Sequence, residues 1–242
     1  MPRIKQSVQD FIASLDRLPP LERKYGEIIK ALEGVADFYG FERIGAPFLD
    51  DPAVFAPLAK AGMFKERPPL FFKADKGEEY AILPSASLAV LRAYGAHKMN
   101  EMPHPLKFMF SGERVWSRGG GDKDICGIFE WGLLVVGEEH ASAEAEIIHV
   151  LWKGLEEAGA LGEGTEIRIN AAGCEQCRSS FHSSLTAYFR ARSSRLCKRC
   201  RRFLRSSPTL ILSCAEERCR ISASHAPQIL DFLCEICKKH LR

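Results

Sequence analysis

Four short-spaced cysteine pairs lie in the last third of the chain and constrain its fold more than any other feature. A two-residue gap lets both thiolates of a pair reach one tetrahedral ion, and two pairs complete an all-thiolate zinc shell. Disulfides are the alternative, but they suit a secreted chain, and we find no basic-then-apolar signal segment. Eight ligands therefore predict two structural zinc ions. The pairs are Cys174-x2-Cys177, Cys197-x2-Cys200, Cys214-x4-Cys219 and Cys234-x2-Cys237.

The segment between the first and second pairs limits which pairs can share an ion. Apolar residues recur at helical spacing from Phe181 to Phe189, which predicts an amphipathic helix between Cys177 and Cys197. A helix of about 16 residues is about 24 Å long, so it separates these two pairs too far for one zinc ion. Each of them is expected to combine with one of the two later pairs, giving interleaved sites. The sequence leaves open which later pair goes with which.

Other candidate ligands are not needed to complete the two sites. His182, His225 and His240 lie near cysteines and can substitute as zinc ligands, but eight thiols already suffice. The ninth cysteine, Cys126, is far from the others and is expected to pack in a sheet.

Composition indicates a folded protein of one or two domains. The 242 residues are 46% hydrophobic and 10% aromatic, values typical of a globular chain. No apolar run approaches the roughly 18 residues of a membrane span, so we expect a soluble protein without a membrane partner. Free cysteines without an export signal favour the reducing cytoplasm.

Charge is distributed unevenly along the chain. Residues 174–242 hold 14 Lys and Arg against 5 Asp and Glu, whereas residues 1–173 hold 20 against 26. Eight thiolates with two Zn2+ would leave the cysteine-rich segment near +5. A basic small domain on an acidic body predicts an anionic partner such as nucleic acid, although a solvated basic face is the simpler alternative.

The basic run at residues 198–205, Lys-Arg-Cys-Arg-Arg-Phe-Leu-Arg, is the best nucleic-acid candidate. A zinc-stapled scaffold that presents these side chains can neutralise several phosphates, and such binding weakens steeply with salt. Three preceding arginines extend the same surface. The predicted RNA-binding residues are Arg190, Arg192, Arg195, Lys198, Arg199, Arg201, Arg202 and Arg205.

Hydrophobic periodicity predicts the other elements. Helices are expected at 21–39, 85–97 and 144–159, with Ser85 or Ser87 as the N-cap of the second. Strands are expected at 41–44, 70–73, 79–83, 107–110, 128–136 and 166–170, with a loose stretch from 46 to 69 and a glycine loop at 118–124. The fold class is therefore α/β, a mixed, mainly antiparallel sheet flanked by helices. We place this body at 1–173 and the small helical zinc-binding domain at 174–242.

Several segments carry a family resemblance that spans nearly the whole chain. Residues 39–47, Tyr-Gly-Phe-Glu-Arg-Ile-Gly-Ala-Pro, precede a proline-punctuated stretch at 102–107 and a strand–loop–strand at 112–137. Together they resemble the first two motifs of histidyl-tRNA synthetase, a class II aminoacyl-tRNA synthetase. Residues 169–177 and 226–237 resemble the entry to and exit from that family's insertion domain, which carries such cysteine pairs in many bacterial members. The resemblance implies a class II fold and a homodimer paired around Pro47.

The chain departs from the family at the substrate-binding positions that the resemblance implies. Ser85 replaces the glutamate that holds the amino group of histidine, and Ser87 replaces a threonine. In the second motif Trp116 replaces the arginine that contacts the α-phosphate of ATP, and Arg118 replaces a glutamate. A shifted placement would bring Arg114 or Arg118 near the phosphate, but it breaks the ungapped match. The substrate-binding positions implied by the resemblance are Ser85, Ser87, Trp116, Arg118, Lys123 and Glu130.

These departures predict a catalytically degenerate relative. Losing one transition-state donor costs about 10²–10³-fold, and several are replaced together here. The chain also stops at Arg242, before the family's histidine-specific segment, third motif and anticodon-binding domain. We therefore expect that none of its residues is catalytic. The expected function is that of a non-catalytic protein that binds the tRNA acceptor arm or other RNA, or that of a regulatory protein.

Two alternatives stay open. One is a histidine–tRNA ligase fragment or subunit that uses ATP and Mg2+ once a separate synthetase-like chain supplies the missing half. The other is a regulatory subunit of histidine biosynthesis, which also uses a synthetase-like body; the insertion module, which serves tRNA, speaks against it.

Overall fold

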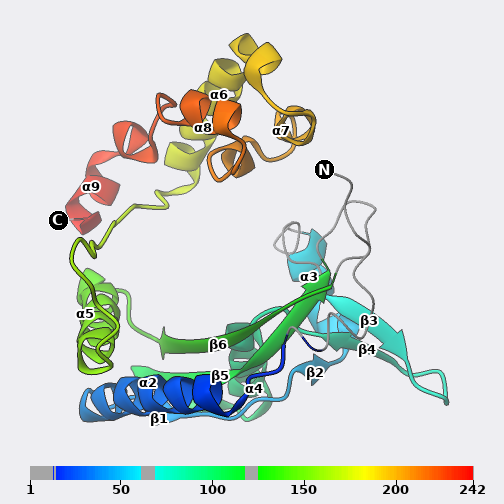
Figure 1. The fold of residues 1–242 in the computed structure, drawn as a ribbon, viewed down its shortest axis with the longest axis vertical. Coiled ribbons are helices and arrows are strands. Elements are labelled where there is room, and N and C mark those ends of the chain that lie inside the picture. Colours follow the sequence, from blue (N-terminus) through cyan, green and yellow to red (C-terminus); the bar gives the residue numbers. More distant parts are fainter. Residues whose placement is uncertain (1–12, 14, 61–68, 118–124, 242) are drawn as a thin grey trace. The chain divides into compact units, whose positions relative to one another are not determined.

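A computed structural model describes residues 13, 15–60, 69–117 and 125–241 of the chain. The chain divides into two compact units, Met1–Glu163 and Gly164–Arg242 (Figure 1). Each unit has a hydrophobic core of its own.

A long β-hairpin forms the centre of the first unit. Strands β5 (Leu106–Ser117) and β6 (Ile125–Val136) pair antiparallel along their whole length, from Leu106 opposite Val136 to Ser117 opposite Ile125. The short strand β1 (Glu42–Arg43) runs parallel to β5 on its other side, which gives the sheet order β1-β5-β6. Since side chains alternate across a sheet, odd- and even-numbered residues of β5 lie on opposite faces.

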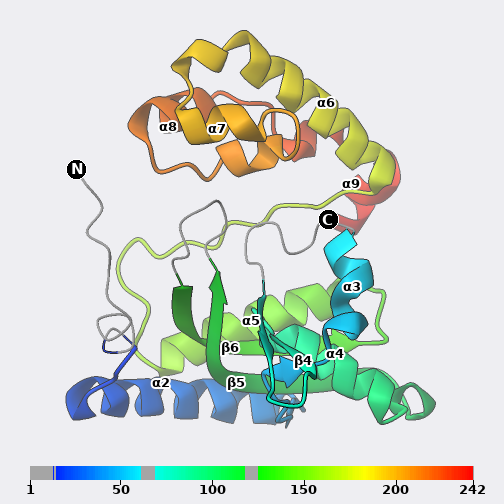
Figure 2. The same cartoon turned by 90° about the vertical axis from the view of Figure 1, so that its right-hand side faces the viewer.

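Helices cover both faces of this sheet. Helices α2 (Pro19–Phe38) and α5 (Ala141–Glu157) lie side by side (Figures 1 and 2) and enclose Met109 of β5 in one core cluster. Helix α4 (Ala86–Ala96) packs on the other face against Phe108 and Phe110. A glycine allows α2 and α5 to approach closely, because a Cβ at Gly154 would lie 2.7 Å from Cδ2 of Leu32.

A second small sheet completes the first unit. Its order is β2-β4-β3, all antiparallel, formed by β2 (Leu49–Asp50), β4 (Glu79–Ile82) and β3 (Leu70–Lys73). Helix α3 (Pro52–Lys60) contributes the buried Phe55 to a cluster with Leu83 and Ala89.

The second unit is a set of helices around a single core. The long helix α6 lines up Phe181, Leu185 and Phe189, which pack against Leu196 and Ile211. Four of the cysteines belong to the same core cluster, so the thiols are part of the packing. The described helices of this unit are α6 (Glu175–Ala191), α7 (Lys198–Phe203), α8 (Glu217–Ala223) and α9 (Glu235–Leu241). Its 3-10 turns are Ser193–Arg195, Pro208–Ile211 and Ile229–Phe232, and a further one, Met99–Glu101, belongs to the first unit.

The predicted fold class is confirmed, with three corrections. The strands are divided between two sheets among the described residues. The loose stretch at 46–69 contains β2 and α3. The strand predicted at 166–170 is wrong: these residues have no regular secondary structure and are exposed. Within the described ranges, no helix is both long and apolar enough to cross a membrane.

Candidate metal centres and the hairpin site

The structure gathers the eight paired cysteines into two clusters of four. The outer cluster consists of Cys174, Cys177, Cys234 and Cys237, and the inner cluster of Cys197, Cys200, Cys214 and Cys219. The first and second pairs serve different clusters, as the intervening helix α6 predicts. The inner cluster lies wholly between the two halves of the outer one in sequence, so the sites are nested and not interleaved.

The outer cluster joins the two ends of the second unit through reciprocal contacts. The backbone N–H of Cys174 donates to Sγ of Cys237 at 3.3 Å, and the backbone N–H of Cys234 donates to Sγ of Cys177 at 3.2 Å. Cys174 is the residue before α6, and Cys234 is the residue before α9. Gly173 brings the chain in with φ +67°, where a Cβ would lie 2.8 Å from Cβ of Cys177.

The inner cluster lies deep in the core of the same unit. Cys200 and Cys219 are 1% and 0% exposed, and Cys197 is also buried. The backbone N–H of Cys197 donates to Sγ of Cys219 at 3.2 Å, which ties the start of α7 to α8. Apolar side chains from α6 and the 3-10 turn at Pro208–Ile211 surround these sulfurs.

The donor geometry fits a tetrahedral ion in both clusters. Four sulfurs about 2.3 Å from one zinc ion lie about 3.8 Å from each other. Within each cluster all four sulfurs lie within 4.8 Å of one another, and all nine cysteines are free thiols. Either cluster can therefore hold one thiophilic ion. Neither cluster includes a histidine, so His182, His225 and His240 are not part of the two donor sets.

Local hydrogen bonding lowers the pKa of at least one thiol in each cluster, of Cys174 and Cys234 in the outer cluster and of Cys197 in the inner one. In the outer cluster the backbone N–H of Cys177 lowers the pKa of Cys174 to about 7. In the inner cluster burial acts to raise the pKa of Cys197, but hydrogen bonds from Cys200 bring it down to about 7. Burial raises the pKa of Cys200 itself. The first thiolate ligand is thus available near neutral pH in both clusters.

The predicted RNA-binding residues border the inner cluster and α6. Seven of the eight are exposed, and Arg192 is half-buried with its guanidinium 3.9 Å from the ring centroid of Tyr188. Among the described residues, none of the eight forms an ion pair with a carboxylate. Their positive charge is therefore available to an anionic partner. As RNA contacts they stay a prediction.

On the even-numbered face of the hairpin, a carboxylate occupies the start of helix α4. Glu130 of β6 accepts hydrogen bonds from the backbone N–H of Ala86 at 2.8 Å and from Oγ of Ser85 at 3.1 Å. Oγ of Ser87 lies 2.9 Å from Oγ of Ser85. Three of the predicted substrate-binding positions thus form one hydrogen-bonded group within the protein.

A buried arginine shares this carboxylate. Nε of Arg114 lies 3.4 Å from Glu130, outside hydrogen-bonding geometry, and Nη1 donates to the backbone oxygen of Glu113 at 2.6 Å. Burial lowers the pKa of Arg114, and the charge of Glu130 partly opposes this. The guanidinium is only 6% exposed, so its charge is directed at Glu130 and the backbone and little of it reaches solvent.

The backbone N–H of Ala86 was not among the predicted substrate positions, and Arg114 was considered only as part of a shifted placement of the second motif. Alternation along the antiparallel hairpin is the signal that puts Arg114 and Glu130 on one face. Trp116 is half-buried near the end of β5, opposite Cys126. Arg118 and Lys123 lie outside the described residues.

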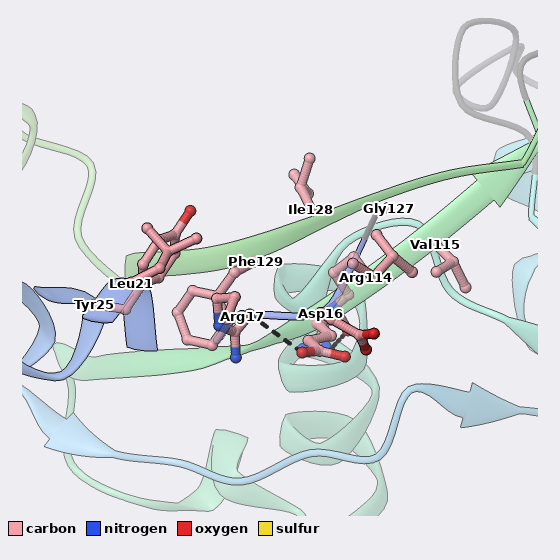
Figure 3. A pocket seen from close by; sticks show the side chains of 11 residues that line it. Asp16, Arg17, Leu21, Tyr25, Arg114, Val115, Gly127, Ile128 and Phe129 are labelled. Atoms are coloured by element: carbon pink, nitrogen blue, oxygen red, sulfur yellow. Dashed lines mark hydrogen bonds and ion pairs between the residues drawn. The ribbon is translucent and has the colours of Figure 1, made fainter. Parts of the chain in front are cut away.

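A separate pocket of about 320 Å³ lies where the start of α2 meets the hairpin (Figure 3). The guanidinium of Arg17 lies over the rings of Tyr25 and Phe129, at 5.1 and 4.9 Å from their centroids. Arg17 also pairs with Glu113 at 3.2 Å. Phe129 and Glu113 belong to the odd-numbered face of the hairpin. Arg114, which pairs with Glu130, also lines the pocket, so the pocket adjoins the Glu130 group.

The fold defines the class of protein to which the chain is similar. No family model matches the chain. Histidyl-tRNA synthetase from S. aureus superimposes on 99% of this chain and 52% of its own, with a TM-score of 0.60 and 24% sequence identity. A Bacillus halodurans structure described as an ATP phosphoribosyltransferase regulatory subunit/histidyl-tRNA synthetase covers 90% of this chain and 62% of its own, with a TM-score of 0.55 and 15% identity. The fold is that of class II aminoacyl-tRNA synthetases.

Sequence comparison narrows the class to one kind of synthetase. Histidine–tRNA ligase of Halothermothrix orenii is 27% identical over 227 residues, 93% of this chain and 54% of the ligase. The ligase of Clostridium perfringens is 25% identical over 97% of this chain and 56% of its own length. The chain is thus a relative of histidine–tRNA ligases, and it spans about half the length of the curated relatives it matches.

Proposed function

We propose that this protein is a non-catalytic RNA-binding relative of histidyl-tRNA synthetase, and that its cysteine-rich unit holds two Zn2+ ions and presents the RNA-binding surface. The observation that carries this proposal is the exposed basic surface beside the inner cluster. Lys198, Arg201 and Arg202 lie on α7, where Sγ of the N-cap residue Cys197 accepts a hydrogen bond from the backbone N–H of Cys200. Phosphates are the natural partners of cations that pair with no carboxylate in the described part of the chain, and the tRNA acceptor arm is the first RNA to test.

The hairpin site supports the non-catalytic part of the proposal. Glu130 already bonds with Ser85 and the start of α4, and it faces the buried charge of Arg114. A ligand ammonium group would meet a carboxylate whose oxygens are engaged and whose charge is balanced. Trp116 offers a single N–H where the resembled family uses a guanidinium. We therefore propose that this site binds neither histidine nor ATP with useful affinity.

Calorimetry on the metal-loaded protein tests both parts. Acceptor-stem RNA is titrated in parallel with ATP and histidine in the presence of Mg2+. The proposal expects salt-sensitive RNA binding and no heat from either small molecule. Micromolar binding of ATP and histidine would overturn the non-catalytic assignment.

A second candidate is a histidine–tRNA ligase completed by residues beyond this half. The relatives match nearly all of this chain with only about half of their own length, which favours this candidate. A charging assay with the complementary half of a relative added as a separate polypeptide distinguishes the two. Histidylated tRNA would establish the ligase, and its absence alongside RNA binding would support the proposed function.

A further inference from the structure

The two cysteine clusters differ in their access to solvent. In the inner cluster three of the four ligands are buried, and only Cys214 is half-buried. In the outer cluster Cys174 and Cys234 are exposed and Cys237 is half-buried, which leaves Cys177 as the one buried ligand. Exchange and oxidation of thiolates require a reagent to reach the sulfur, so both reactions are expected to be faster at the outer cluster than at the inner one.

The clusters also differ in what holds their surroundings together. The inner cluster is enclosed by Leu185, Phe189, Leu196 and Ile211, each fully buried. Helix α9, which carries Cys237 of the outer cluster, has no buried residue, and Ile236 on it is 81% exposed. A seven-residue helix without a buried face is unstable by itself. The outer cluster, through Cys237, therefore ties α9 to its unit.

We propose that the outer cluster is an exchangeable, oxidisable metal site whose occupancy determines whether α9 stays packed against its unit. The inner cluster retains its ion and acts as a structural metal site. This inference rests on the metal binding in the proposed function. The ligand class is a thiophilic divalent ion, with Zn2+ as the resident ion and Co2+ or Cd2+ as probes.

Oxidation of the outer thiolates by a peroxide would release the metal ion. Sγ of Cys174 and Sγ of Cys177 lie 3.4 Å apart, close enough to join after a small shift. One hydrogen peroxide molecule accepts two electrons from two thiolates, the sulfurs join as a disulfide, and two protons complete two water molecules. Two peroxide molecules thus convert the four outer thiolates into two disulfides and free the ion. A dithiol reductant reverses the step and restores the site.

The experiment follows metal release from the full chain loaded with two equivalents of Zn2+. A chromogenic chelator reports free zinc during treatment with hydrogen peroxide, and mass spectrometry after alkylation identifies the thiols that have reacted. We expect one equivalent to leave at least about tenfold faster than the second, with the outer cysteines modified first. Trypsin cleavage after Lys238 and Lys239 should accelerate with the first equivalent, because α9 comes loose.

Two variants show which cluster releases its zinc ion quickly and which releases it slowly. Cys234→Ser should remove the fast equivalent and leave the slow one, whereas Cys214→Ser should weaken only the slow one. Equal release rates, or earlier modification of the inner thiols, would overturn the inference while leaving the proposed metal binding intact. A purified protein that takes up no metal would contradict both. A fast first phase without faster cleavage at Lys238 would refute the link to α9.

Discussion

The carboxylate of Glu130 lies 3.1 Å from the hydroxyl of Ser85, a residue 45 positions earlier in the chain. Ser85 stands where the resembled family has the glutamate that holds the amino group of histidine. The hairpin therefore delivers an acidic group from β6 to the place where that glutamate is missing from α4. Here the carboxylate accepts a hydrogen bond from the N–H of Ala86 at the start of the helix and faces Arg114. We propose that its role is structural.

Replacing Glu130 with glutamine tests this structural role. The amide keeps an acceptor for Ala86 but leaves the buried Arg114 without its carboxylate, which should lower the free energy of unfolding by about 1–3 kcal/mol. Urea denaturation measures the effect. The control is Arg114→Met combined with Glu130→Gln, which should recover part of the loss because no buried charge remains. An unchanged midpoint for Glu130→Gln would show that the pair does not stabilise the fold.

The metal content is a second prediction. The purified protein should contain two equivalents of zinc by elemental analysis, since each cluster has a full tetrahedral donor set. Cys200→Ser should reduce this to about one equivalent and lower the helical signal of the second unit. Strong chelation should unfold that unit, because metal binding and folding are coupled. Two equivalents retained in Cys200→Ser would show that the inner cluster is not a metal site.

The contact between α2 and α5 gives a third prediction. Gly154→Val should destabilise the first unit by about 1–3 kcal/mol, because the added atoms collide with the side chain of Leu32 and lie near its backbone. Gly34→Ala on α2 is the matched control: its Cβ meets no atom within 4 Å, and alanine should stabilise the helix by up to about 1 kcal/mol. Thermal melts of both variants measure the difference. Equal melting temperatures would contradict the packing described for these helices.

Much of the fold could be predicted because it depends on local patterns. The apolar stripe from Phe181 to Phe189 indicated a helix of the right length, and that length correctly separated the cysteine pairs. The combination of each early pair with its later partner depends on how α8 and α9 return to the core. No local pattern encodes that return.

The errors have equally local causes. Helix α3 was missed because Pro57 lies inside it, and proline ordinarily argues against a helix interior. The buried Phe55 anchors the helix regardless. The strand predicted at 166–170 has an alternating pattern, but among the described residues no strand pairs with it, and Ile167 and Ile169 are exposed. Tertiary contacts decided both cases.

The candidate sites also differ in whether local sequence spacing or tertiary structure brings their residues together. The cysteines of the two clusters were predictable because a tetrahedral thiolate site needs its donors at fixed short spacings. The group formed by Ser85, Glu130 and Arg114 joins residues from α4, β5 and β6, and it becomes visible only when the hairpin register is known.

The most direct test of the proposed function is the salt dependence of RNA binding. The affinity of the zinc-loaded protein for an acceptor-stem RNA is measured from low to physiological salt, for the native protein and for Arg201→Glu/Arg202→Glu. The matched control is Arg23→Glu/Lys24→Glu, which makes the same charge change at exposed positions of α2 in the first unit. We predict that the first variant binds more weakly and that its log–log salt slope is shallower by about 2, with the control unchanged. Equal weakening in both variants, or no RNA binding by the native protein, would contradict the proposal.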